Sequence, residues 1–95
     1  MPWPRRPRKA SHAFVPRISK KHDLRGDLDR LGSAIRAARL DLQMSQEALA
    51  DTAGIDRSHM GKIERGERNV SLLNLLRVAD ALKVQPSQLL EKCGL

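Results

Sequence analysis

Residues 44–65, MSQEALADTAGIDRSHMGKIER, contain the pattern that decides the fold: two short helical segments separated by a glycine turn. Ser45 and Asp56 each have an apolar residue just before them and another at the fourth position after them, the hydrophobic staple of a helix start. Their side-chain oxygens can accept the unpaired amides of a first helical turn. We therefore expect helices over residues 46–53 and 57–65.

The link between these two segments is so short that the helices must cross at a steep angle, which is the geometry of a helix-turn-helix. Ala50 is small where the helices would approach, and Gly54 stands where a left-handed closing residue is needed. The apolar residues expected to face inward are Leu49, Ala53, Ile55, Met60 and Ile63. The alternative is a helical bundle that merely uses the same corner.

The staple pattern recurs twice further along the chain. Ser71 and Gln85 are flanked in the same way, and Pro86 suits the first position of a helix. These signals predict helices over residues 72–83 and 86–92. The helical stops expected at glycines are Gly54, Gly66 and Gly94.

A helical spacing also precedes the turn, and it predicts a first helix that begins between Asp23 and Gly32. The residues expected on its inward face are Leu24, Leu28, Leu31, Ile35, Ala38 and Leu42. Those expected on the opposite face are Arg30, Arg36, Arg39 and Asp41. No segment alternates with the period of a strand, so the fold class is all-α, a bundle of five short helices.

The net charge of +7 is confined to one end of the 95 residues. Residues 1–22 hold seven basic side chains, no acidic one and four of the five prolines, whereas residues 23–95 hold eleven of each charge. We expect a flexible basic arm followed by a neutral domain. The two aromatic residues, Trp3 and Phe14, lie in the arm, so the core of the domain should be aliphatic.

Several classes of function are not supported by the sequence. No apolar run is long enough to span a bilayer and no signal peptide is evident, which predicts a cytoplasmic protein without membrane attachment. Three histidines and the single Cys93 lack metal-ligand spacing, and the glycines Gly54 and Gly61 are too far apart for a phosphate-binding loop. We therefore expect no catalytic residue, metal, cofactor or small-molecule ligand.

Four stretches carry a resemblance to a known family: MSQEALA at 44–50, Gly54-Ile55, IERGERN at 63–69 and ADAL at 79–82. With them, residues 31–92 resemble the helix-turn-helix domain of phage repressors and of the xenobiotic-response-element-type regulators. The sequence of residues 63–76 is also similar to that of the controller proteins of restriction–modification systems. The resemblance implies a five-helix bundle of the lambda-repressor-like type. It also implies a sequence-specific regulator of transcription that binds double-stranded DNA in the nucleoid, as a dimer on a (pseudo)palindromic operator, with the third helix in the major groove.

The outward face of the third helix supplies the candidate base contacts if Met60 and Ile63 point inward. Arg and Lys donate to guanine O6 and N7, and Ser can meet several bases, so each half-site should contain G·C pairs. Gly61 should lie on the exposed side, where it would allow a close approach to the bases or leave room for the long side chains of Arg57 and Lys62; the alternative is a neutral surface glycine. The candidates are Arg57, Ser58, Gly61, Lys62 and Arg65.

Phosphate contacts are expected near helix starts and in the loop after the third helix, where amides and polar groups favour an anion. The candidates are Gln46, His59, Arg68, Asn69 and Ser71, each of which could instead be a cap or a solvated side chain. The resemblance supports the phosphate role of Gln46. It also implies that Arg39 and Glu64 form a partly buried structural ion pair, the alternative being two solvated charges.

The dimer contact should come from the domain itself, since no further domain follows the fifth helix in this sequence. Leu90 and Leu95 are the candidates. An alternative function is an antitoxin-type module that binds a protein partner through residues 1–22 as well as DNA. A further alternative is that this arm is an extension without a function.

Overall fold

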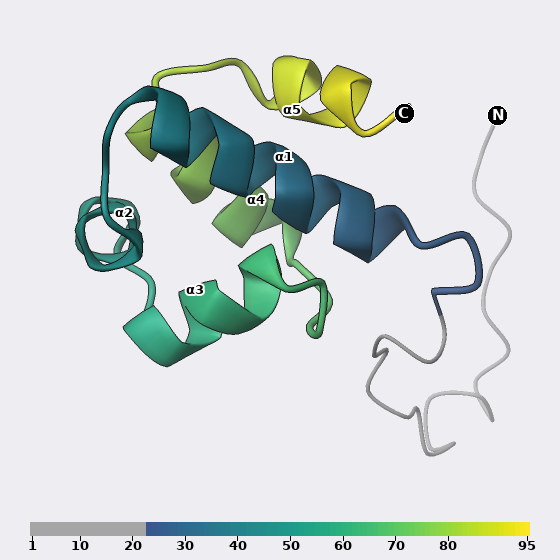
Figure 1. The fold of residues 1–95 in the computed structure, drawn as a ribbon, viewed down its shortest axis with the longest axis horizontal. Helices are drawn as coiled ribbons and strands as arrows, with labels where there is room; N and C mark the ends of the chain where they lie inside the picture. Colours follow the sequence, from purple (N-terminus) through teal and green to yellow (C-terminus); the bar gives the residue numbers. More distant parts are fainter. Residues whose placement is uncertain (1–22) are drawn as a thin grey trace, which may run out of the picture.

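The computed structural model describes residues 23–95, and the expected arm, residues 1–22, lies outside the described residues. The described part contains only helices as regular elements (Figure 1). They are α1 (Asp27–Asp41), α2 (Gln46–Ala53), α3 (Arg57–Glu64), α4 (Leu72–Ala81) and α5 (Pro86–Lys92). The predicted all-α bundle of five short helices is thereby confirmed.

Side-chain caps set the helix starts where the sequence predicts them. Ser45 Oγ accepts from the Ala48 amide at 2.9 Å, and Ser71 Oγ accepts from the Asn74 amide at 3.1 Å. Before α5, the Gln85 amide donates to the side chain of Gln88 at 2.7 Å. These bonds satisfy amides that have no partner inside the helix, which is why the starts of α2, α4 and α5 agree with the prediction.

Residues other than glycine close α1 and α4, and the end of α4 therefore differs from the prediction. Gln43 and Lys83 adopt the left-handed conformation at φ 55° and 59°, so α4 ends at Ala81 and not at residue 83. Leu24 is 94% exposed because it precedes the helix, and Leu42 is 44% exposed beyond its last turn. The expectation that these two leucines face inward is therefore wrong.

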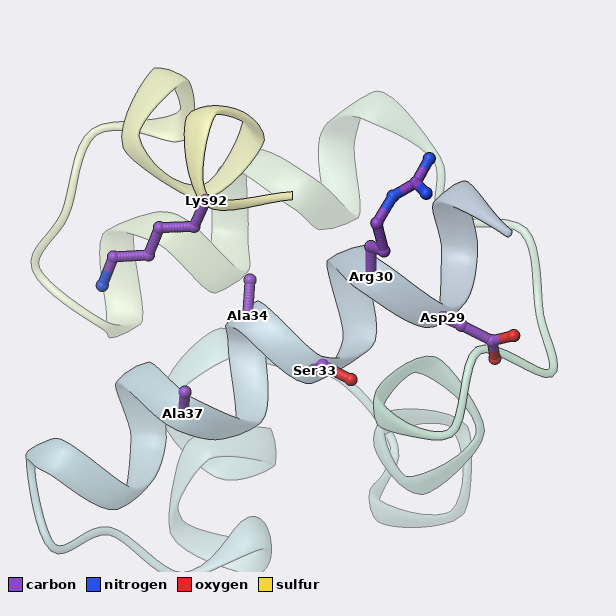
Figure 2. Close-up of a pocket in the computed structure, with 6 residues that line it drawn as sticks. All are labelled: Asp29, Arg30, Ser33, Ala34, Ala37 and Lys92. Carbon is purple, nitrogen blue, oxygen red and sulfur yellow. The ribbon is translucent and has the colours of Figure 1, made fainter. Parts of the chain in front are cut away.

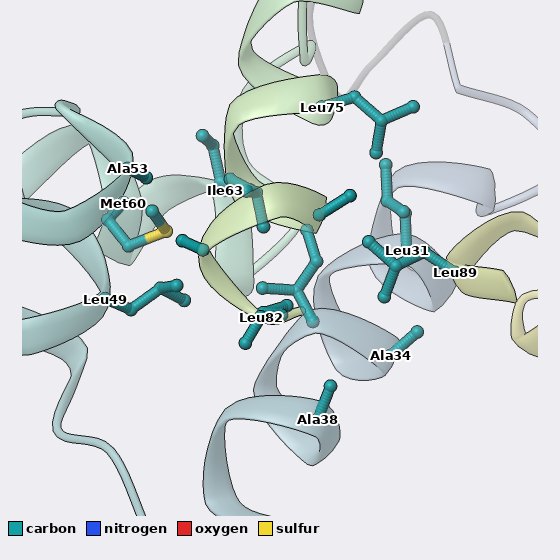
Figure 3. Packing of buried hydrophobic residues seen from close by; sticks show 14 of the residues in the cluster. Leu31, Ala34, Ala38, Leu49, Ala53, Met60, Ile63, Leu75, Leu82 and Leu89 are labelled. Carbon is teal, nitrogen blue, oxygen red and sulfur yellow. The ribbon is translucent and has the colours of Figure 1, made fainter. Parts of the chain in front are cut away.

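The core is aliphatic, as predicted, and all five helices contribute to it (Figure 3). Its most completely buried large side chains are Ile35, Leu49, Met60, Ile63, Leu82, Leu89 and Val78. Cys93 is also buried, and its thiol donates to the Leu90 carbonyl. In Figure 1, α5 lies on one side of α1 and α3 lies on the other, so α1 is the central element that positions both.

One close approach fixes α3 against α1. A Cβ at Gly32 would lie 2.5 Å from the carbonyl oxygens of Ile63 and Glu64, a distance that real Cβ atoms essentially never show. Only glycine therefore lets the last turn of α3 press directly on the middle of α1. The contact holds α3 through backbone atoms and leaves its opposite side uncovered by α1.

Candidate nucleic-acid interface

The start of α2 and the outer side of α3 enclose an open hollow of about 370 Å³. It is lined by Gln46, Arg57, Ser58, Gly61, Lys62 and Arg65. All five predicted base contacts and one predicted phosphate contact thus share one surface. The helical period of α3 brings the five base candidates together on the side away from Met60 and Ile63, and the packing of α2 on α3 adds Gln46.

Two of the three cations in this hollow have no side-chain partner among residues 23–95. Within residues 23–95, no hydrogen bond or ion pair involves the side chain of Arg57 or of Lys62. Arg57 is exposed and Lys62 is half-buried. Their donors are therefore free to bind acceptors from outside the protein.

Ser58 has a more restricted hydrogen-bonding role. Its hydroxyl and its amide both donate to the Asp56 carboxylate, which caps α3. The Ser58 hydroxyl bond is the main reason that the pKa of Asp56 lies below its usual range, and the His59 amide adds to the effect. Because its proton is already used, the Ser58 hydroxyl is left as an acceptor toward any external group.

Gly61 is buried, which corrects the expectation that it lies on an exposed side. The side chains of Gln46 and Arg65 lie over it: an added Cβ would come 3.2 Å from Gln46 Oε1 and 3.1 Å from Arg65 Nη1. The glycine therefore does leave room for long side chains. Those side chains belong to Gln46 and Arg65, however, and not to Arg57 and Lys62.

A buried ion pair lies directly behind the hollow. Arg39 Nε and Nη2 donate to the two carboxylate oxygens of Glu64 at 2.8 and 2.9 Å. Their side chains are only 10% and 3% exposed. The expectation that Arg39 lies on the outward face of α1 is therefore wrong. Arg39 follows the buried Ile35 by one helical turn, and at this edge of the inward face it pairs with Glu64 of α3.

Two further bonds extend this pair to the start of α2. Arg39 Nη1 donates to the Met44 carbonyl at 3.0 Å, and Gln46 Nε2 donates to Glu64 at 3.2 Å. Gln46 is thus connected to α1 and α3 through one network. Sequence reasoning missed this role because eighteen residues separate Gln46 from Glu64 and no short motif links them.

The remaining phosphate candidates lie outside the lining of the hollow. Arg68 and Asn69 belong to the loop between α3 and α4, where Arg68 is half-buried and Asn69 is exposed. His59 is half-buried on α3, and the oxygen of Ser71 is already used as the cap of α4. The structure therefore groups the base candidates with Gln46 and places the other four beyond them.

A second open hollow, of about 400 Å³, lies between α1 and α5 and contains none of the predicted contacts (Figure 2). It is lined by Asp29, Arg30, Ser33, Ala34, Ala37 and Lys92. Arg30 pairs with Asp27, and Figure 2 shows the long side chains of Arg30 and Lys92 pointing in different directions. This hollow therefore lacks a converging set of polar groups.

Neither a membrane span nor a metal-ligand cluster occurs in the described part of the chain. None of its helices is long and apolar enough to cross a bilayer. Residues 23–95 likewise contain no group of three or more His, Cys, Asp or Glu side chains placed to hold a metal ion. The segment on which the toxin-binding alternative depends, residues 1–22, lies outside the described residues.

Known proteins with similar sequences are regulators. The family model described as helix-turn-helix matches residues 35–89. Control protein C.BamHI of Bacillus amyloliquefaciens is 46% identical over 61 residues, which cover 63% of this chain and 75% of that protein. Control protein C.SmaI of Serratia marcescens is 40% identical over 65 residues, covering 68% and 77%.

A similar solved structure is also that of a controller protein. The restriction–modification controller protein C.AhdI from Aeromonas hydrophila superposes with a TM-score of 0.66 at 47% identity. The match covers 67% of this chain and 97% of C.AhdI.

Proposed function

The chain belongs to the helix-turn-helix family, and from this premise we propose that it binds a (pseudo)palindromic operator as a homodimer, with α3 in the major groove. As a member of this family it is a DNA-binding transcription regulator and not an enzyme. The observation that carries the proposal is the hollow between α2 and α3, where three cations, a hydroxyl and an amide converge.

The chemistry of the hollow fits the edges of base pairs in a major groove. Arg57 and Lys62 have unused donors, which suit O6 and N7 of guanine. The Ser58 hydroxyl already donates to Asp56, so toward DNA it accepts, and the amino groups of adenine and cytosine are the donors it would meet. Arg65 reaches the same surface with part of its guanidinium, and we expect each half-site to contain G·C pairs.

A phosphate would lie at the start of α2, beside the hollow. The first amides of that helix and the Gln46 side chain are donors, and the helix dipole favours an anion there. One amide hydrogen of Gln46 is directed to Glu64 and the other remains for a phosphate. Further contacts to DNA phosphates around this surface are proposed for four residues: His59, Arg68, Asn69 and Ser71.

The two-fold contact of the proposed dimer requires exposed apolar residues. Leu95 is 58% exposed, whereas Leu90 packs partly against the core. Leu72 and Leu73 at the start of α4 are 71% and 57% exposed, and sequence reasoning did not single them out. Leu95→Lys should lower the fraction of dimer measured by analytical ultracentrifugation, and so should the double substitution of Leu72 and Leu73 by Lys. Leu40→Lys on α1 should leave that fraction unchanged. A monomer with full operator affinity would refute the dimer.

The basic residues 1–22 supply a further proposal, a sequence-independent attraction to DNA phosphates. Because DNA is the proposed target, we also propose that the protein is located at the nucleoid. The similarity to control proteins adds a finer proposal, that the regulated genes encode a restriction–modification pair.

Selection of bound duplexes from a random pool tests the proposed function. We expect two symmetric half-sites spaced by about one helical turn. Arg57→Ala and Lys62→Ala should each cost about 1–3 kcal/mol of discrimination at a defined base pair. Arg77→Ala, an exposed arginine of α4 that does not line the hollow, is the matched control and should leave base preference intact. A pool that stays random would contradict sequence-specific binding.

A further inference from the structure

The turn after α3 has a shape that its hydrogen bonds fix. The Glu67 amide donates to the Lys62 carbonyl at 2.9 Å and the Gly66 amide donates to the Ile63 carbonyl at 3.0 Å, which is a Schellman motif. Gly66 is left-handed at φ 71°, and a Cβ there would come 2.8 Å from Cα of Asp29 on α1. The backbone of Glu67 is therefore held in one place relative to α3.

From this position the Glu67 carboxylate binds Arg65 with two parallel hydrogen bonds. Arg65 Nε donates to Oε1 at 3.0 Å, and Nη2 donates to Oε2 at 3.1 Å. These bonds raise the pKa of the Arg65 guanidinium above its usual value. They use two of its five N–H donors, and the other three lie at the end of the guanidinium away from Glu67.

That free end lies over the hollow. Arg65 Nη1 is 3.1 Å from the position of a Cβ at Gly61, which is part of the hollow's lining. One N–H from each terminal nitrogen forms a fork of the kind that binds O6 and N7 of guanine. Arg57 and Lys62 have no such clamp, so Arg65 is the one cation of this hollow whose orientation is set in advance.

A carboxylate beside a DNA-binding surface also has a cost. Glu67 is 45% exposed, and its negative charge repels phosphates wherever the protein meets DNA. The repulsion applies to every sequence, whereas the gain from an oriented Arg65 is available only at a guanine. A device that weakens binding to wrong partners more than to the right one increases specificity.

We propose that Glu67 is a specificity-determining positioning residue: it holds Arg65 so that the free end of the guanidinium reads a guanine, and its charge weakens binding to DNA of every sequence, a cost that only the guanine contact offsets. The inference rests on the proposed function, because it concerns how α3 reads an operator. Glu67 itself need not touch the DNA.

Glu67→Gln in the full chain tests this inference, because glutamine keeps the size of the side chain but removes the charge and one of the two acceptors. Affinities are measured for the selected operator, for each single-base change in it, and for a random duplex at several salt concentrations. We expect tighter binding to the random duplex, with a salt slope steeper by up to about 0.9. The preference for guanine at one position per half-site should fall by about fivefold or more.

Two further variants separate charge from geometry. Glu91→Gln removes an exposed carboxylate of α5, away from the hollow, and should leave base preference unchanged. Glu67→Asp keeps the charge but shortens the reach to Arg65. It should lose guanine preference while keeping the weak binding of the wild type to random duplex.

The decisive control is the background in which Arg65 is replaced by Ala. There the guanine preference at that position should already be gone, and adding Glu67→Gln should change base preference no further. The inference is overturned if Glu67→Gln keeps the full guanine preference, or if it alters base preference without Arg65. A wild-type protein with no base preference at any position would instead overturn the proposed function itself.

Discussion

Removing Arg39 should destabilise the protein far more than removing any exposed arginine. The substitution Arg39→Ala leaves the Glu64 carboxylate, whose side chain is 3% exposed, with Gln46 as its one remaining side-chain donor. It also leaves the Met44 carbonyl without its partner. Removing one partner of a buried ion pair lowers the free energy of unfolding by about 3–5 kcal/mol, because the other partner is left as an uncompensated buried charge.

That cost is large for a domain of this size. A domain spanning residues 23–95 is expected to have roughly 4–11 kcal/mol of stability in total. At about 4–8 °C per kcal/mol, Arg39→Ala should lower the melting temperature by at least about 12 °C. The assay is far-ultraviolet circular dichroism with denaturant or heat, because residues 23–95 contain no Trp, Tyr or Phe whose fluorescence could be followed.

Arg36→Ala supplies the matched control, since this arginine is exposed on the same helix and should cost no more than about 0.5 kcal/mol. A second variant replaces the pair together, Arg39→Met with Glu64→Leu. It should recover much of the stability, because no charge is left unpaired. If Arg39→Ala melts within a degree or two of Arg36→Ala, the pair does not stabilise the fold and the reasoning fails.

Three other measurements test separate parts of the structure. Gly61→Ala should raise helix stability by up to about 1 kcal/mol while weakening operator binding, because the new methyl displaces Gln46 and Arg65; unchanged or improved binding would contradict this role. Asp56→Ala should lower the unfolding midpoint at pH 7. The pKa of Asp56 is lowered in the fold, so its contribution is present above the ordinary aspartate range and is lost as the pH falls through the folded value; a gap as wide at pH 2 as at pH 7 would count against the charged cap. Deleting residues 1–22 should flatten the salt dependence of DNA binding by up to about 0.9 log units for each phosphate that the segment neutralises, with base preference intact; an unchanged slope would show that the segment does not touch DNA.

The sequence was most informative where a local signal has one physical meaning. Ser45, Asp56 and Ser71 mark helix starts because their oxygens accept first-turn amides, and the structure contains those bonds. Helix ends without glycine could not be predicted, because nothing in the side chain of Gln43 or Lys83 indicates a left-handed backbone.

The candidate site could likewise be predicted only in part from the sequence. The helical period alone brings Arg57 and Lys62 to one surface of α3. The bonds of Gln46 to Glu64, and of Arg65 to Glu67, depend on how helices and turns are placed in space. The burial of Gly61 follows from those same side chains, so the sequence could not indicate it.

The close contact at Gly32 bears on how a new operator could be acquired. The last turn of α3 is held by its own backbone against α1, and its inward side by Met60 and Ile63, so none of this support involves Arg57 or Lys62. Under the proposed function, exchanging those two side chains should alter the preferred DNA at almost no cost in folding. If α3 reads the operator as proposed, a new operator can be acquired by changes at these two positions while the scaffold that presents them keeps its sequence.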